Sequence, residues 1–149
     1  MTDKHVYHQM FMEWESVITY GNQSFERYET INALFHYHNA INIAETLLMI
    51  HPESRQSIGA LLVSYHNLSD FYEREGAFNM AWHTLSFIEG KMQEHRQRFQ
   101  RCEAVLWGYG VARKQKLLFE KHHITNVVAG ITGTSVTQYK SEYYPHSYH

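Results

Sequence analysis

Residues 65–88 read YHNLSDFYEREGAFNMAWHTLSFI, and this stretch decides the fold. On both sides of Gly76 the apolar residues recur at intervals of three and four, which is the spacing of amphipathic helices. Glycine readily takes the left-handed conformation that ends a helix, so Gly76 predicts a tight turn. A single helical hairpin cannot bury its apolar faces alone and needs neighbours of the same kind. The stretch therefore predicts an all-α protein built from antiparallel helical hairpins.

The composition fits one helical domain. The chain has 149 residues, of which 44% are hydrophobic and only 2 are proline. Cys102 is the single cysteine, which excludes an internal disulfide and a cysteine zinc cluster. The first residues lack the basic and then apolar plan of a signal peptide, and the apolar runs are too short to cross a bilayer. We therefore expect a soluble, cytoplasmic protein with no membrane association.

Helical periodicity and breaker residues predict five helices, at residues 5–20, 24–50, 54 or 57 to about 75, 78 to about 93, and 105 to about 121. Gly21 is interpreted as the end of the first helix and Ser24 as the N-cap of the second. Pro52 ends the second helix, because the residue before proline resists helical geometry. Residues 124–149 lack helical periodicity. We therefore divide the chain into a helical domain, residues 1–123, and an extended, weakly held tail, residues 124–149.

The hairpin resembles a tetratricopeptide repeat in seven residues, namely Tyr65, Leu68, Ser69, Tyr72, Gly76, Phe78 and Ala81. In that family small residues allow two helices to cross closely, and aromatic residues fill the wedge between them. Ser69 and Ala81 match the small positions, and Tyr72 and Phe78 match the aromatic ones. The resemblance covers about residues 24–93. The glycines at 21 and 76 are 55 residues apart, against about 34 in the standard repeat, so we expect a tetratricopeptide-like superhelix with elongated helices.

The resemblance implies a partner-binding groove lined by the first helix of each hairpin. On the clear repeat the matching positions are Val63, His66, Asn67, Asp70, Glu73 and Arg74. Two acidic residues in this set favour a basic or amphipathic protein or peptide partner. An ordinary solvated helix face is the alternative interpretation. The resemblance implies a non-enzymatic protein–protein interaction module: an adaptor, a regulatory subunit or a small chaperone. A homo-oligomer is a further expectation, because short repeat arrays leave apolar end faces uncovered.

Charge is unevenly distributed along the chain. Residues 1–90 hold eleven acidic against four basic residues, whereas residues 91–121 hold eight basic against three acidic residues. Arg96, Arg98 and Arg101 form the densest basic cluster. They support an alternative function, a nucleic-acid-associated regulator that uses the basic 91–121 segment. We rank it below protein binding because the sequence pI of about 6.6 is far from the basic range typical of nucleic-acid binders.

The sequence gives little support for chemistry. Among twelve histidines, the pair His5 and His8 and the pair Glu120 and His123 have same-face helical spacing. A di-iron bundle needs two Glu-x-x-His motifs and two further glutamates, so a metal-dependent helical bundle is the third-ranked alternative. The chain contains no Gly-x-Ser-x-Gly motif and no phosphate-binding loop. We therefore expect no enzyme activity, with no catalytic residue, metal or cofactor.

Overall fold

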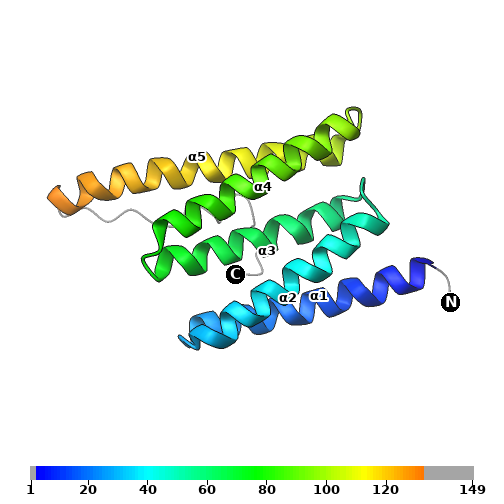
Figure 1. Ribbon diagram of the computed structural model, residues 1–149, viewed down its shortest axis with the longest axis horizontal. Helices are drawn as coiled ribbons and strands as arrows, with labels where there is room; N and C mark the ends of the chain where they lie inside the picture. Colours follow the sequence, from blue (N-terminus) through cyan, green and yellow to red (C-terminus); the bar gives the residue numbers. More distant parts are fainter. Residues whose placement is uncertain (1–2, 133–149) are drawn as a thin grey trace.

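The computed structural model describes residues 3–132 and the side chains of residues 4–123. This part of the chain is all-α and contains no strand. The five helices are α1 (Asp3–Glu26), α2 (Thr30–Ile50), α3 (Arg55–Arg74), α4 (Phe78–Arg98) and α5 (Glu103–Thr132) (Figure 1). Consecutive helices are joined by short turns and pack as antiparallel pairs. The predicted fold class, an all-α arrangement of helical hairpins, is therefore confirmed.

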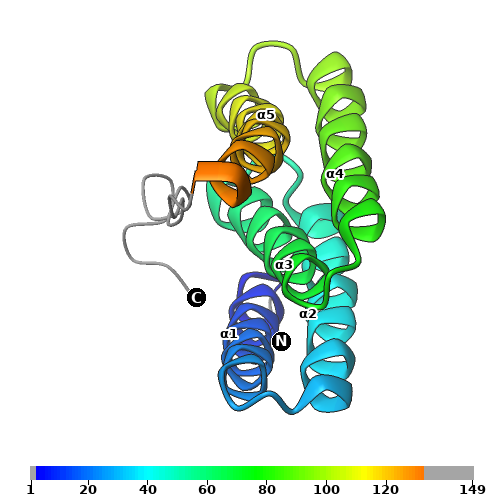
Figure 2. The same cartoon turned by 90° about the vertical axis from the view of Figure 1, so that its left-hand side faces the viewer.

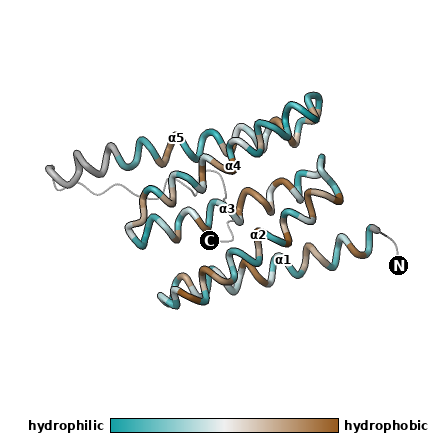
Figure 3. Tube along the Cα trace, viewed as in Figure 1, coloured by the Kyte–Doolittle hydropathy of each residue, from teal (hydrophilic) through white to brown (hydrophobic). Residues whose placement is uncertain are grey.

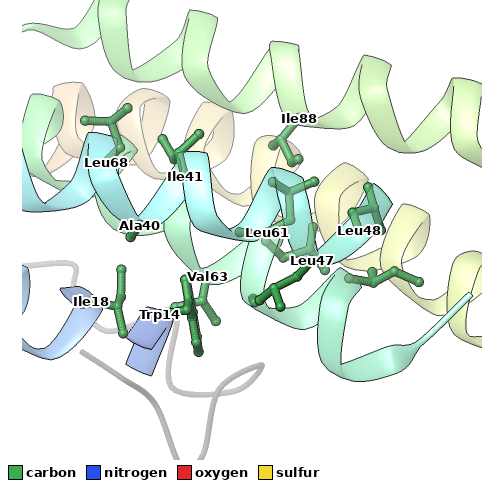
Figure 4. Close-up of a cluster of buried hydrophobic side chains, with 14 of the residues drawn as sticks. Trp14, Ile18, Ala40, Ile41, Leu47, Leu48, Leu61, Val63, Leu68 and Ile88 are labelled. Atoms are coloured by element: carbon green, nitrogen blue, oxygen red, sulfur yellow. The ribbon is translucent and has the colours of Figure 1, made fainter. Parts of the chain in front are cut away.

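The helices form two layers. Viewed along their axes, α1, α3 and α5 lie on one side of the molecule and α2 and α4 on the other (Figure 2). Helix α3 is central: it contacts each of the other four helices, and 13 of its 20 residues are buried. Figure 4 shows core side chains from four helices, among them Trp14, Leu47, Leu61 and Ile88. The core of the domain is thus built around α3.

Helices α1, α3 and α5 run parallel with a constant offset of 50 residues. Trp14 donates a hydrogen bond to Ser64 at 2.8 Å, and the oxygens of Tyr7 and Ser57 lie 2.6 Å apart; both pairs are 50 residues apart. The same separation joins Glu73 to His123, whose atoms Oε2 and Nε2 lie 3.0 Å apart. The chain therefore repeats its hairpin about every 50 residues, and not every 55 as the glycine spacing suggested.

The first turn lies elsewhere than predicted. Gly21 does not end a helix but is buried within α1, where an added Cβ would lie 2.7 Å from a ring carbon of Tyr37. Its lack of a side chain lets α2 approach closely. Ser24 is likewise inside α1 and is no N-cap. The chain turns at residues 27–29, where Tyr28 takes a left-handed φ of 60°. The residue equivalent to Gly76 in the first hairpin is therefore a tyrosine.

The second hairpin matches its prediction more closely. Ser54 caps α3, and Gly76 has the left-handed φ of 77° expected of the turn. Ser69 donates a hydrogen bond to the carbonyl of Ala81 at 3.1 Å, which confirms the close crossing of α3 and α4 at these small residues. Phe78 does not fill the wedge between the helices: its side chain is half exposed and packs edge-on against the ring of His123.

The last helix is longer than predicted. It was expected to end near residue 121, yet α5 continues to Thr132. Residues 124–132, which we assigned to an extended tail, are therefore helical. The rest of the predicted tail, residues 133–149, lies outside the described residues.

The packing of α5 against α3 predicts opposite effects for two glycines on the same helix. An added Cβ at Gly108 would lie 2.4 Å from Cγ2 of Ile58, whereas nothing lies within 4 Å at Gly110. We expect Gly108→Ala to lower the free energy of unfolding by about 1–3 kcal/mol through overpacking. We expect Gly110→Ala to raise it by about 0.5–1 kcal/mol through helix propensity. Urea unfolding of both variants measures this difference, and equal effects would contradict the described packing.

Candidate partner-binding faces

The structure does not place the six predicted groove residues on an open surface. Val63, His66, Asn67 and Asp70 are all buried, and only Glu73 and Arg74 are partly exposed. The prediction that these residues line an open groove is therefore corrected. A helical pattern identifies the faces of a helix but not what packs on them. Helix α3 contacts all four other helices. It therefore has less solvent-exposed surface than a helix at the edge of the domain.

Two of the six residues have structural roles toward the first hairpin. The side-chain oxygen of Asn22 accepts hydrogen bonds from the Tyr37 hydroxyl at 2.8 Å and from the Asn67 amide at 3.0 Å. Arg74 donates to the carbonyl of Phe25, and its guanidinium lies 3.5 Å from the centroid of that ring. Burial raises the pKa of Tyr37 above its usual range, and the charge of Arg74 offsets this only in part. These contacts hold the end of the first hairpin against α3.

Glu73 links α3 to α5. Its carboxylate lies 3.0 Å from His123, and the ring of His123 also packs against Phe119 with centroids 4.1 Å apart. His123, which shares a same-face helical spacing with Glu120, is thus part of a packed contact between helices. Among the described residues, no group of three histidine, cysteine, aspartate or glutamate side chains is arranged to hold a metal ion.

The open concave feature on the layer of parallel helices is an apolar recess of about 200 Å³. It lies between α1, α3 and α5, and we call it the inner recess. Its lining residues are Phe11, Trp14, Arg55, Gln56, Gly59, Ala60, Val63 and Trp107. Gly59 and Ala60 leave room for the recess because they have no side chain or a small one, and the guanidinium of Arg55 lies 4.0 Å from the ring of Trp107.

Sequence reasoning missed the inner recess, although it named one of its residues, Val63. The local signal is the small pair Gly59 and Ala60 on an otherwise bulky helix. The two tryptophans that flank the pair come from helices about 45 residues away on either side in sequence. Only the parallel packing of α1, α3 and α5 brings these four residues together. The residue pattern of α3 alone therefore does not predict the inner recess.

A second hollow, of about 460 Å³, lies between α2 and α4 on the opposite layer. We call it the outer groove. Glu45 is its central charge: one carboxylate oxygen accepts a hydrogen bond from Tyr65 at 3.0 Å, and the other pairs with Lys91. Burial, reinforced by the negative charge of Glu45, raises the pKa of Tyr65 above its usual range. The central carboxylate of the outer groove is thus paired within the domain.

The three predicted basic residues do come together. Arg96, Arg98 and Arg101 are all exposed where α4 meets α5, at the hydrophilic end of the molecule in Figure 3. The guanidinium groups of Arg96 and Arg98 lie over the rings of Tyr109 and Phe99, at 4.8 and 5.7 Å from the centroids. Arg98 and Arg101 also line a hollow of about 510 Å³. The predicted alternative basic face is therefore a real surface feature of the fold.

In the part of the chain that the structure describes, these features define the class of protein: an all-α array of helical hairpins with an apolar recess on its parallel layer and a charged groove on the opposite layer. The chain belongs to the family described as "Protein of unknown function (DUF2753)", whose model matches residues 12–138. No curated protein and no solved structure matches the chain. A search of the described helices found none long and apolar enough to cross a membrane.

The shared acceptor on Asn22 predicts strong coupling between two substitutions. Asn22→Ala removes the acceptor of two buried donors and should cost about 2–4 kcal/mol of unfolding free energy. Tyr37→Phe alone should cost about 1 kcal/mol. In the Asn22→Ala background the second substitution should cost much less, because the hydroxyl it removes has already lost this acceptor. A double-mutant cycle by urea unfolding measures the coupling, and additive costs would contradict the network.

Proposed function

We propose that this protein is a non-enzymatic protein–protein interaction module of tetratricopeptide-like architecture that acts in the cytoplasm. It holds a partner segment on the face formed by α1, α3 and α5. The observation that carries the proposal is the inner recess, an open apolar hollow walled by two tryptophans on three packed helices. Helical hairpin arrays commonly present such a concave face to a partner. Rigid aromatic walls are typical of the residues that dominate binding energy at interfaces.

The shape and charge of this face favour a particular kind of partner. A recess of about 200 Å³ accepts one large apolar or aromatic side chain, which would act as an anchor. Helix α1, which supplies one wall of the recess, carries four acidic residues against one basic residue, so positive charge on the partner beside α1 would speed association. The proposed partner is therefore an amphipathic or basic segment with an exposed apolar side chain. An adaptor, a regulatory subunit and a small chaperone all work in this way.

Filling the recess tests this function. Gly59→Leu places a side chain in the recess without removing any contact, since the nearest atom to an added Cβ is a ring carbon of Trp107 at 3.8 Å. The matched control is Gly90→Leu on α4, where nothing lies within 4 Å. We expect a stoichiometric partner captured from native lysate by the wild type and the control to be lost with Gly59→Leu. Equal capture by all three proteins would contradict binding at the recess.

The alternative function, a nucleic-acid-associated regulator, is favoured by Arg98 and Arg101, which line one hollow, and by the exposed Arg96 on the same stretch of chain. The carboxylate of Glu53 also lines this hollow and weakens its positive potential. Binding of this kind would fall steeply with salt, by roughly one power of salt concentration per phosphate contact. A salt titration of any nucleic acid recovered with the protein, compared with the triple glutamine variant of these arginines, separates the two functions.

A further inference from the structure

The inner recess lies within reach of a segment of the chain itself. Because α5 runs parallel to α3 with an offset of 50 residues, the recess residues Gly59 and Val63 lie beside residues 109 and 113 of α5. Helix α5 continues to Thr132 and extends past the α3–α4 turn (Figure 1). The end of α5 is therefore about 20 residues of helix beyond the recess, or roughly 30 Å at about 1.5 Å per residue.

The chain that follows Thr132 is long enough to return this distance. Seventeen residues, 133–149, remain after the last described residue. A fully extended chain covers about 3.3 Å per residue, so about ten residues bring it back to the recess. The residues at that point of the sequence are close to Tyr143 and Tyr144. The five residues after Tyr144 are not needed to span the distance between the end of α5 and the recess.

The chemistry of this segment suits the recess. Residues 139–149 read YKSEYYPHSYH, with four tyrosines and one proline. Tyrosine combines an apolar ring with a hydroxyl that can stay at the surface, and it packs well against tryptophan. The segment is close to neutral, because Lys140 is balanced by Glu142, so burying part of it on an apolar surface removes little net charge from water. The aromatic character of the segment is therefore complementary to the apolar lining of the recess.

We propose that the C-terminal segment, residues 133–149, runs back along α3 and places Tyr143 or Tyr144 in the inner recess of the same molecule. This inference rests on the proposed function in one respect: the segment would then compete with the partner for the same site. An intramolecular ligand on a short tether acts at an effective concentration of roughly millimolar. A partner must displace the segment from the recess. Only a partner whose affinity for the recess exceeds this competition therefore binds.

Site-specific photo-crosslinking in the full-length protein tests the docking without any partner. Benzoylphenylalanine replaces Tyr144, and crosslinked peptides are mapped by mass spectrometry after irradiation of the purified protein. We expect a product of monomer mass that joins residue 144 to peptides containing Gly59, Val63 or Trp107. The same experiment with Gly59→Leu should give about tenfold less product, the change expected for the loss of one aromatic anchor. With Gly90→Leu the yield should not change.

Several outcomes would overturn the proposal. A product of dimer mass would show that the segment binds a second copy. Crosslinks to the outer groove, near Glu45 or Lys91, would place it on the other layer. A yield that Gly59→Leu leaves unchanged would show that the recess is not the site.

Partner capture by the double variant Tyr143→Ser, Tyr144→Ser separates this proposal from the proposed function. Stronger capture by this variant than by the wild type supports both proposals. Monomeric crosslinks to the recess without any captured partner would uphold the docking and contradict the function. Capture that needs the recess but is insensitive to the two tyrosines would uphold the function and contradict competition by the segment.

Discussion

The structure depends on the close, parallel packing of α3 against α1 and α5. On one side, Trp14 and Tyr7 contact the serines of α3, and the Ser57 hydroxyl donates a hydrogen bond to the carbonyl of Leu47. On the other side, Gly108 has no side chain where Ile58 of α3 approaches. Small residues at such crossings let helices approach closely, and buried hydroxyls make the register specific, since a shifted register would leave them unpaired. Everything else in the fold follows from this register.

The same packing determines where a partner has room. Parallel helices at a constant offset bring side chains of α1 and α5 to the same stretch of α3, so Trp14 and Trp107 line one recess together with Gly59 and Ala60. On the opposite layer α2 and α4 leave a wider hollow, but Glu45 engages both Tyr65 and Lys91 there. An apolar surface that no other side chain covers binds a partner more readily than paired charges do, because the charges lose their hydration when they are buried. This contrast is why we assign partner binding to the parallel layer.

Sequence reasoning predicted those features that have a local signal. The turn at Gly76, a helix start at Ser54 or Ser57 and the crossing at Ser69 each depend on the residue at that position, and the structure has all three, with Ser54 as the cap. Gly21 was misread because a glycine that lets two helices approach has the same local signature as one that ends a helix. Tyr28 gave no signal at all, since a bulky residue rarely takes a positive φ.

The candidate site was harder to predict than the fold for the same reason. Periodicity separated the faces of α3 but did not identify the neighbours that cover them, so buried residues such as His66 and Asp70 were assigned to a groove. The basic cluster at Arg96, Arg98 and Arg101 was predicted correctly as a surface because its members are close in sequence. The inner recess combines residues from three helices, and only their packing brings these residues together.

The parallel offset of 50 residues is the central claim, and nuclear Overhauser effects in the full-length protein test it most directly. The account predicts cross-peaks between the Ile58 methyl groups and the α protons of Gly108, and between the Trp14 indole NH and the β protons of Ser64. Cross-peaks from these groups to residues one helical turn away, or their absence in an otherwise assigned spectrum, would contradict the register and with it the inner recess.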